Sequence, residues 1–124
     1  SAILKIKQSG KPSGNNPFIA LGGLLVDIRN GAFGTNALTK SDFQAAATVK
    51  QVAAFNKTPE NKWYSATLAQ AGMDNLNKTG ITQFRLYFSR DDNNNKRADL
   101  IKFFGGNSAT DQPTIIITYS IPVP

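Results

Sequence analysis

Hydrophobic and polar residues alternate in short runs along this chain, with the period of two that β-strands show. In residues 2–7, Leu4 and Ile6 share one face while Lys5 and Lys7 share the other. Similar runs follow at residues 24–29, 49–55 and 63–68, separated by loops rich in Gly, Asn and Pro. Together with three runs inside residues 82–120, they predict about seven strands.

The fold prediction rests mainly on the stretch at residues 82–120. Its first run places apolar side chains on one face and polar or polar-tipped side chains on the other: Phe84, Leu86 and Phe88 against Gln83, Arg85 and Tyr87. We expect the first set in the core and the second presented at the surface, because side chains alternate sides along a strand. The run at residues 114–120 is apolar on both faces, which suits a central strand or one that lies under another layer, and it is the best candidate for a sheet centre.

Two short segments break the strand pattern. Ser41 can cap a short helix over residues 42–47, with Asp42 in its first turn, and one helical turn is expected around Met73. The sequence therefore predicts an all-β fold, an antiparallel β-sandwich of the jelly-roll type with one or two short helical turns. Its 124 residues fit a single β-sandwich domain, residues 1–124.

Composition excludes several kinds of chemistry. The chain has no cysteine and no histidine, which excludes disulfides, Cys-ligated metals and catalysis of the Ser-His or Cys-His type. Glu60 is the only glutamate, and Asp27 and Asp99 are expected to be exposed charges. No pair of carboxylates across a cleft is indicated, so we do not expect an enzyme.

The formal net charge is +6, but the 14 Lys and Arg residues form no dense basic run. Phosphate binding favours clustered cations, so no specific nucleic-acid site is expected. No segment is long and apolar enough to span a bilayer, and the first residues lack a signal-peptide pattern. Because the sequence also begins without Met, we expect a mature or excised chain.

The loop at residues 89–99 holds the densest cluster of oxygen-bearing side chains. Calcium takes six to eight oxygen ligands, and one ion could be wrapped by Asp91, Asp92, Asn93, Asn95 and Asp99. Lys and Arg residues in the same loop oppose this, and the spacing is not that of an EF-hand. The alternative is a solvated hairpin loop. Calcium is the one cofactor that the sequence suggests.

Aromatic rings suit stacking on the apolar face of a sugar, and the candidates are Trp63, Tyr64, Tyr87 and Tyr119. Tyr87 shares its strand face with Gln83 and Arg85, a stripe suited to an oligosaccharide, particularly an acidic one. We predict this stripe and Trp63 as carbohydrate contacts. The alternatives are that the stripe packs on a second sheet or a neighbouring subunit, and that Trp63 lies in the core.

Two Asn-Lys-Thr sequons begin at Asn56 and Asn77, both in predicted turns. They are candidate glycosylation sites. The pattern is short and arises by chance in an Asn-rich chain, and its use depends on the source organism.

Several of these runs together resemble a known family. They are residues 2–7 and 24–29, Phe43 with the alanines after it, the Trp63-Tyr64 strand, residues 84–89, the acidic loop before Ala98 and Asp99, and residues 103–107 and 113–122. In this pattern the chain resembles the carbohydrate-binding-module-like jelly-roll domains of the DNRLRE type, found in secreted and surface proteins of bacteria and archaea. The resemblance implies a jelly roll and an extracellular or cell-surface location.

Domains of this type usually have further strands before the segment that residues 2–7 resemble. Those strands were cut away, or this protein dispenses with them, or another copy supplies one; an unfilled place in a sheet favours pairing with another chain. Two functions follow. One is a non-catalytic module that binds a polysaccharide or cell-surface glycan, or serves as an accessory domain of a surface protein. The other is a structural subunit of an extracellular filament or surface layer, assembled by strand exchange between copies.

Overall fold

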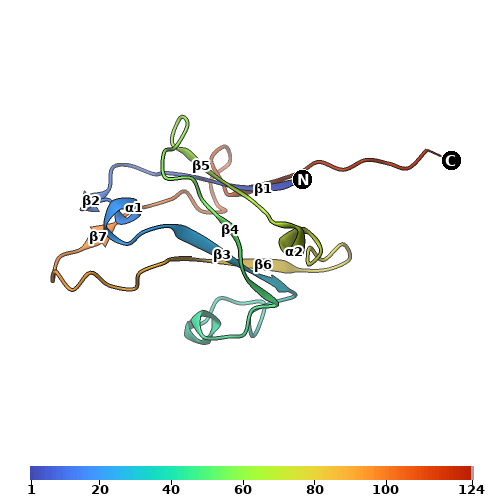
Figure 1. Ribbon diagram of the computed structural model, residues 1–124, viewed down its shortest axis with the longest axis horizontal. Helices are drawn as coiled ribbons and strands as arrows, with labels where there is room; N and C mark the ends of the chain where they lie inside the picture. The colour runs from blue at the N-terminus through green and yellow to red at the C-terminus, as the bar shows by residue number, and fades with distance from the viewer. Residues whose placement is uncertain (124) are drawn as a thin grey trace.

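The computed structural model describes residues 1–123 and has an antiparallel all-β architecture (Figure 1), which confirms the predicted all-β class. Pro124, the last residue of the predicted domain, lies outside the described residues. One sheet has the order β5 (Trp63–Thr67), β1 (Ala2–Lys7), β8 (Thr114–Ile117). A second has the order β4 (Val49–Ala54), β3 (Leu24–Asn30), β6 (Thr82–Phe88). The short strands β2 (Ser13–Gly14) and β7 (Asp99–Leu100) pair separately.

The two three-stranded sheets contribute to one hydrophobic core. Leu4 and Ile6 of β1 are buried, as are Val26 and Ile28 of β3, and these are the faces that the alternation predicts. Between the sheets, the ring of Tyr64 stacks on that of Phe18 with 4.5 Å between centroids. Figure 1 shows β1 and β5 as one layer and β3 and β6 as the other.

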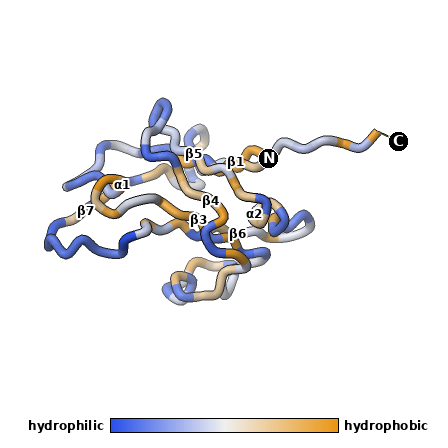
Figure 2. The backbone as a smooth tube through the Cα atoms, in the orientation of Figure 1, coloured by the Kyte–Doolittle hydropathy of each residue, from blue (hydrophilic) through white to orange (hydrophobic). Residues whose placement is uncertain are grey.

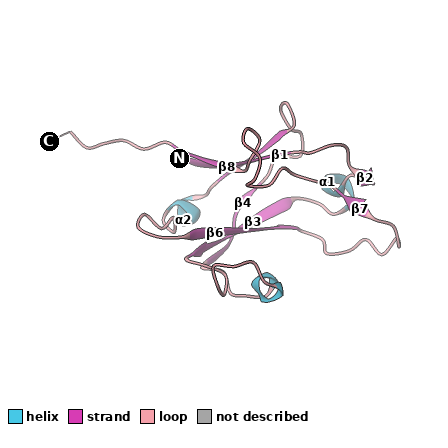
Figure 3. Ribbon diagram, turned by 180° about the vertical axis from the view of Figure 1, so that it is seen from behind, coloured by secondary structure: helices cyan, strands magenta, loops and turns pink. Residues whose placement is uncertain are grey.

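One side of the core is closed where the chain passes from β4 to β5. The N–H of Asn56 donates to the carbonyl of Ser65 at 3.0 Å, and the N–H of Ala69 donates to that of Val52 at 2.8 Å. Strands β8 and β6 are the outer strands of their sheets away from this junction (Figure 3). Among the described residues, the core is therefore flanked on that side by two strand edges that pair with no further strand.

The described part of the chain contains three short helical segments that connect the strands: α1 (Pro17–Ala20), the 3-10 turn η1 (Lys40–Phe43) and α2 (Gln70–Met73). The turn α2 confirms the prediction around Met73. The prediction of a helix over residues 42–47 capped by Ser41 is wrong, because the turn begins earlier, with Thr39 as N-cap and its N–H donating to the carboxylate of Asp42 at 2.9 Å. None of the helices within residues 1–123 is long and apolar enough to cross a membrane.

The prediction that residues 114–120 form a central strand is also wrong. Strand β8 pairs only with β1 among the described strands, and it ends at Ile117. Ile116 and Ile117 are about half exposed. Thr118 still bonds to Ser1, and residues 119–123 then leave the body as an extended segment (Figures 1 and 3). Apolar periodicity identifies faces suited to burial, but it does not reveal what covers them.

Candidate functional site

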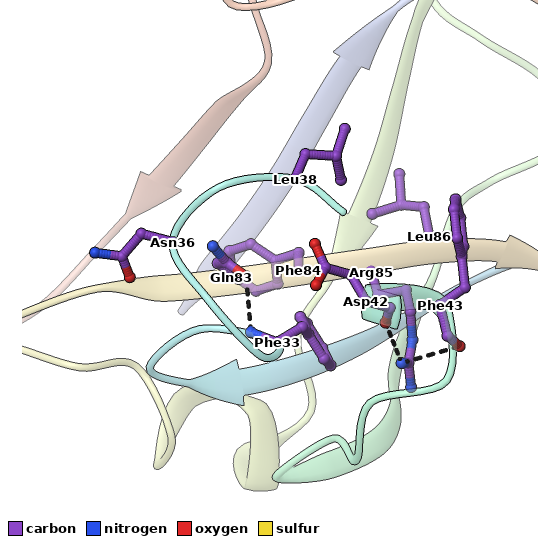
Figure 4. Close-up of a pocket in the computed structure, with 9 residues that line it drawn as sticks. All are labelled: Phe33, Asn36, Leu38, Asp42, Phe43, Gln83, Phe84, Arg85 and Leu86. Carbon is purple, nitrogen blue, oxygen red and sulfur yellow. Dashed lines mark hydrogen bonds between the residues drawn. The ribbon is translucent and has the colours of Figure 1, made fainter. Parts of the chain in front are cut away.

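The polar stripe of β6 is covered by the loop at residues 31–48. The Oε1 of Gln83 accepts the N–H of Phe33 at 2.8 Å. The Nη1 of Arg85 donates to the carbonyls of Asp42 and Ala45 at 2.9 and 2.6 Å, and its guanidinium lies 4.6 Å from the ring centre of Phe33. Figure 4 shows these side chains where the loop meets β6. The stripe thus holds a loop in place.

Asp27 lies on the same face and is only 1% exposed, so the prediction that it is an exposed charge is wrong. Its carboxylate accepts hydrogen bonds from Arg85 at 2.7 Å, the Gln51 N–H at 2.9 Å and the Tyr87 hydroxyl at 3.0 Å. Burial by itself raises the pKa of Asp27, but these bonds outweigh it and leave that pKa below its usual value. Burial and the Asp27 contact raise the pKa of Tyr87.

The predicted carbohydrate contacts therefore differ in how far they are free to meet a ligand. The polar groups of Gln83, Arg85 and Tyr87 are engaged within the chain. Trp63 lies opposite Lys7 on the outer face of its sheet, half-buried, with the ammonium groups of Lys5 and Lys7 5.9 and 5.7 Å from its ring centre. Among these four predicted contacts, Trp63 is the one that combines an accessible ring with nearby cations. Carbohydrate binding stays a prediction.

In the loop at residues 89–99, the candidate calcium ligands mostly bond to their own loop. Asn93 donates to the carboxylate of Asp99 at 2.8 Å, Asp92 accepts the N–H of Asn94 at 2.7 Å, and Asn95 accepts the N–H of Arg97 at 2.8 Å. Within residues 1–123, no three His, Cys, Asp or Glu side chains form a group that could hold a metal ion. Calcium binding by Asp91, Asp92, Asn93, Asn95 and Asp99 stays a prediction.

Both sequon asparagines lie in loops between named elements, and their side chains accept backbone N–H groups. The Oδ1 of Asn56 accepts the N–H of Ser65 at 2.7 Å, and that of Asn77 accepts the N–H of Thr79 at 3.0 Å. Asn56 is exposed and Asn77 is partly exposed. Their modification stays a prediction.

A cavity of about 300 Å³ lies along β6 and is lined by four consecutive strand residues, 83–86 (Figure 4). Successive side chains of a strand point to opposite faces, so a cavity that touches four in a row lies at the strand's edge. The other edge of β6 is occupied by β3. Leu38 and Phe43 also line this cavity and are 88% and 74% exposed. The open edge of β6 is therefore bordered by exposed apolar side chains.

The segment at residues 118–123, here called the tail, is the other uncovered apolar feature. Tyr119, Ile121 and Val123 are 77%, 77% and 92% exposed. Figure 2 shows apolar residues toward the end of this extended segment, in contrast to the hydrophilic loop between β6 and β7. Their spacing of two places them on one face of an extended chain. An exposed apolar strand face of this kind is typical of an interaction surface.

No protein-family model, curated protein or solved structure matches this chain. Sequence reasoning missed Leu38 and Phe43 as members of an edge cavity, because isolated apolar residues in a loop have no periodic signal. The prediction of a central strand at residues 114–120 covers only the first part of the tail.

Proposed function

We propose that this chain is a non-catalytic, extracellular structural subunit that assembles into a filament or surface layer by strand exchange. The tail of one copy would pack on the next copy. The observation that carries this proposal is the extended tail with Tyr119, Ile121 and Val123 exposed on one face. The extracellular setting rests on the resemblance to secreted and surface jelly-roll domains.

Burial of Tyr119, Ile121 and Val123 on a second copy would offset the free-energy cost of association. Full burial of a large apolar side chain is worth about 1.5–3 kcal/mol. Association costs roughly 4–15 kcal/mol of lost freedom. Side-chain burial alone therefore only balances this cost, and a ladder of main-chain hydrogen bonds is needed as well. Strand exchange provides both at the same surface.

The mass of the purified chain in solution tests the proposal, measured by light scattering and supported by negative-stain microscopy. We expect the wild-type chain to form oligomers or filaments, and Ile121→Asp to remain a monomer of 13.4 kDa. Ile19→Asp is the matched control, because Ile19 is 84% exposed but lies on α1. It should assemble like the wild type. A wild-type chain that stays monomeric at every concentration would refute strand exchange.

A second candidate function, binding of an acidic polysaccharide, is favoured by the ring of Trp63 beside Lys5 and Lys7. Cations beside an accessible aromatic ring suit a sugar that carries carboxylates or sulfates. Affinity electrophoresis in gels that contain such a polysaccharide tests it. Retardation that Trp63→Ala abolishes, while the far-ultraviolet circular dichroism is unchanged, would support this function. Equal mobility of the two proteins in every gel would dismiss it.

A further inference from the structure

We infer that the acceptor of the exchanged tail is the open edge of β6, and that the tail of a second copy pairs with it in antiparallel orientation through Tyr119, Ile121 and Val123. This inference rests on the proposed function and specifies its interface. Three observations support it: the direction of the backbone groups of β6, the direction of those of the tail, and the faces on which the side chains lie.

The backbone bonds of β6 show which residues face its open edge. The N–H of Ser89 donates to the carbonyl of Gly23, and the N–H of Gly31 donates to the carbonyl of Ile81. The odd-numbered residues of β6 therefore direct their backbone groups toward β3. In an antiparallel ladder, successive residues direct their N–H and C=O groups to opposite edges. The backbone groups of Phe84, Leu86 and Phe88 therefore point to the open edge. Within residues 1–123, β6 pairs only with β3 as a strand.

The tail has the complementary arrangement. Ser1 and Thr118 exchange two hydrogen bonds, at 2.9 and 2.8 Å, so even-numbered residues of β8 and its extension face β1. In an extended continuation, Tyr119, Ile121 and Val123 direct their N–H and C=O groups the other way. Pro122 has no N–H and falls in the even set. The edge of the tail formed by Tyr119, Ile121 and Val123 therefore keeps all its N–H donors. The opposite edge, formed by the even-numbered residues, lacks a donor at Pro122.

The side chains select the antiparallel orientation. In an antiparallel pair, two residues that exchange N–H···O=C bonds lie directly opposite each other on the two strands. Their side chains lie on the same face of the sheet. Tyr119, Ile121 and Val123 would then lie beside Phe84, Leu86 and Phe88. These β6 side chains border the core but are only partly buried, whereas Val26 on the adjacent strand is 0% exposed. In a parallel pair, the odd tail residues would instead lie beside Arg85, on the polar face.

The edge cavity supports β6 over β8 as the acceptor. It is lined by Leu38 and Phe43, which do not pack into the core of their own chain. A second cavity of about 330 Å³ is also lined by Phe43, Arg85 and Leu86, but it extends over the sheet to Asp27 of β3 and Lys50 of β4. A strand added to β6 would cover the edge cavity. Strand β8 offers a shorter edge, Thr114–Ile117, than the seven residues of β6.

Disulfide trapping tests the pairing, because the chain has no cysteine of its own. A Leu86→Cys chain is mixed under oxidising conditions with chains carrying one tail cysteine: Tyr119→Cys, Ile121→Cys or Val123→Cys, with Thr118→Cys and Ser120→Cys as matched controls. Every tail position is exposed, so these variants should fold alike. We expect a mixed disulfide from the odd position that lies opposite Leu86, formed about tenfold faster than from either even position.

A second variant avoids any change in β6 itself. Leu38→Asp alters an exposed side chain of the edge cavity and should raise the dissociation constant for assembly about tenfold or more, while Ile19→Asp leaves it unchanged. Assembly that needs Ile121 but is unaffected by Leu38→Asp and gives no odd-position disulfide would overturn the β6 acceptor and leave the proposed function standing. Preferential cross-linking from even positions would overturn the antiparallel pairing. Absence of any assembly would remove both proposals.

Discussion

Arg85 and Asp27 occupy directly opposite positions on β6 and β3, with Nη2 and Oδ2 2.7 Å apart. Both lie on the sheet face that the sequence pattern assigns to solvent, yet Asp27 is fully enclosed. The same guanidinium bonds to carbonyls of the loop at residues 31–48. One side chain therefore ties two strands to the loop that covers them, and the edge cavity depends on that loop.

Loss of the Asp27 carboxylate should be costly, because it leaves the Arg85 charge buried without its partner. We expect Asp27→Ala to lower the free energy of unfolding by about 3–5 kcal/mol, measured by urea denaturation. Asp91→Ala, at an exposed position, is the control and should change it by less than about 0.5 kcal/mol. Equal stability of the two variants would show that the ion pair contributes nothing.

The lowered pKa of Asp27 predicts the direction of an acid effect. The ordinary pKa of this carboxyl is 3.8, and the folded value is lower. The stabilisation by the charged carboxylate is therefore present above pH 3.8 and is lost as the pH falls through the folded pKa. Urea midpoints measured between neutral and acid pH should fall less steeply for Asp27→Asn than for the wild type. Identical slopes would assign the acid effect to other carboxyls.

Replacement of Arg85 by Lys should free the loop while keeping the charge. A single ammonium cannot bridge the Asp27 carboxylate and the Asp42 and Ala45 carbonyls in the way a planar guanidinium does. We expect Arg85→Lys to accelerate amide hydrogen exchange in residues 42–46, with the central residues of β3 still protected. Unchanged exchange in the loop would mean that other contacts hold it.

Gly14 should be sensitive to a methyl group. It has φ +70°, and a Cβ there would collide with the carbonyl oxygen of Ala98, next to the β2–β7 pairing. Gly14→Ala is expected to cost about 1–3 kcal/mol and to separate this strand pair. Gly10→Ala is a matched control, because Gly10 has φ +77° but open space around it. A thermal melt should show the larger loss for Gly14→Ala.

Salt distinguishes assembly from nonspecific anion binding. Copies of a chain with net charge +6 repel one another, and screening by salt weakens that repulsion. We expect the assembled fraction to rise between low and moderate ionic strength, measured by sedimentation. Binding to nucleic acid through bulk charge would fall over the same range. Assembly that disappears as salt is added would contradict an apolar interface.

The sequence predicted the parts of the fold that depend on local alternation. The inward faces of β1 and β3 follow from side chains such as Leu4 and Val26, because a strand that covers a core must repeat every two residues. The burial of Asp27 does not follow from its neighbours. It depends on a loop that closes over the sheet and on a partner, Arg85, that comes 58 residues later.

The site was less predictable than the fold for a related reason. The pattern places Gln83, Arg85 and Tyr87 together on one strand face, but the bonds of Gln83 and Arg85 to the covering loop and that of Tyr87 to Asp27 are tertiary. The apolar run that ends in the tail was recognised, yet an edge strand and a central strand can share the same composition. Only the pairing of β8 with β1 alone separates the two cases.

The tail and the β6 edge belong to different surfaces of one subunit, so a contact between them is heterologous: each copy gives one surface and receives on another. Such contacts close into a ring when the rotation between copies allows it, a reciprocal pair being the smallest ring, and otherwise continue into an open helical fibre. An open fibre would have two chemically distinct ends, one showing an unfilled β6 edge and the other an unused tail. Growth at each end could then be blocked separately, by a free tail peptide or by a subunit whose own tail has been removed.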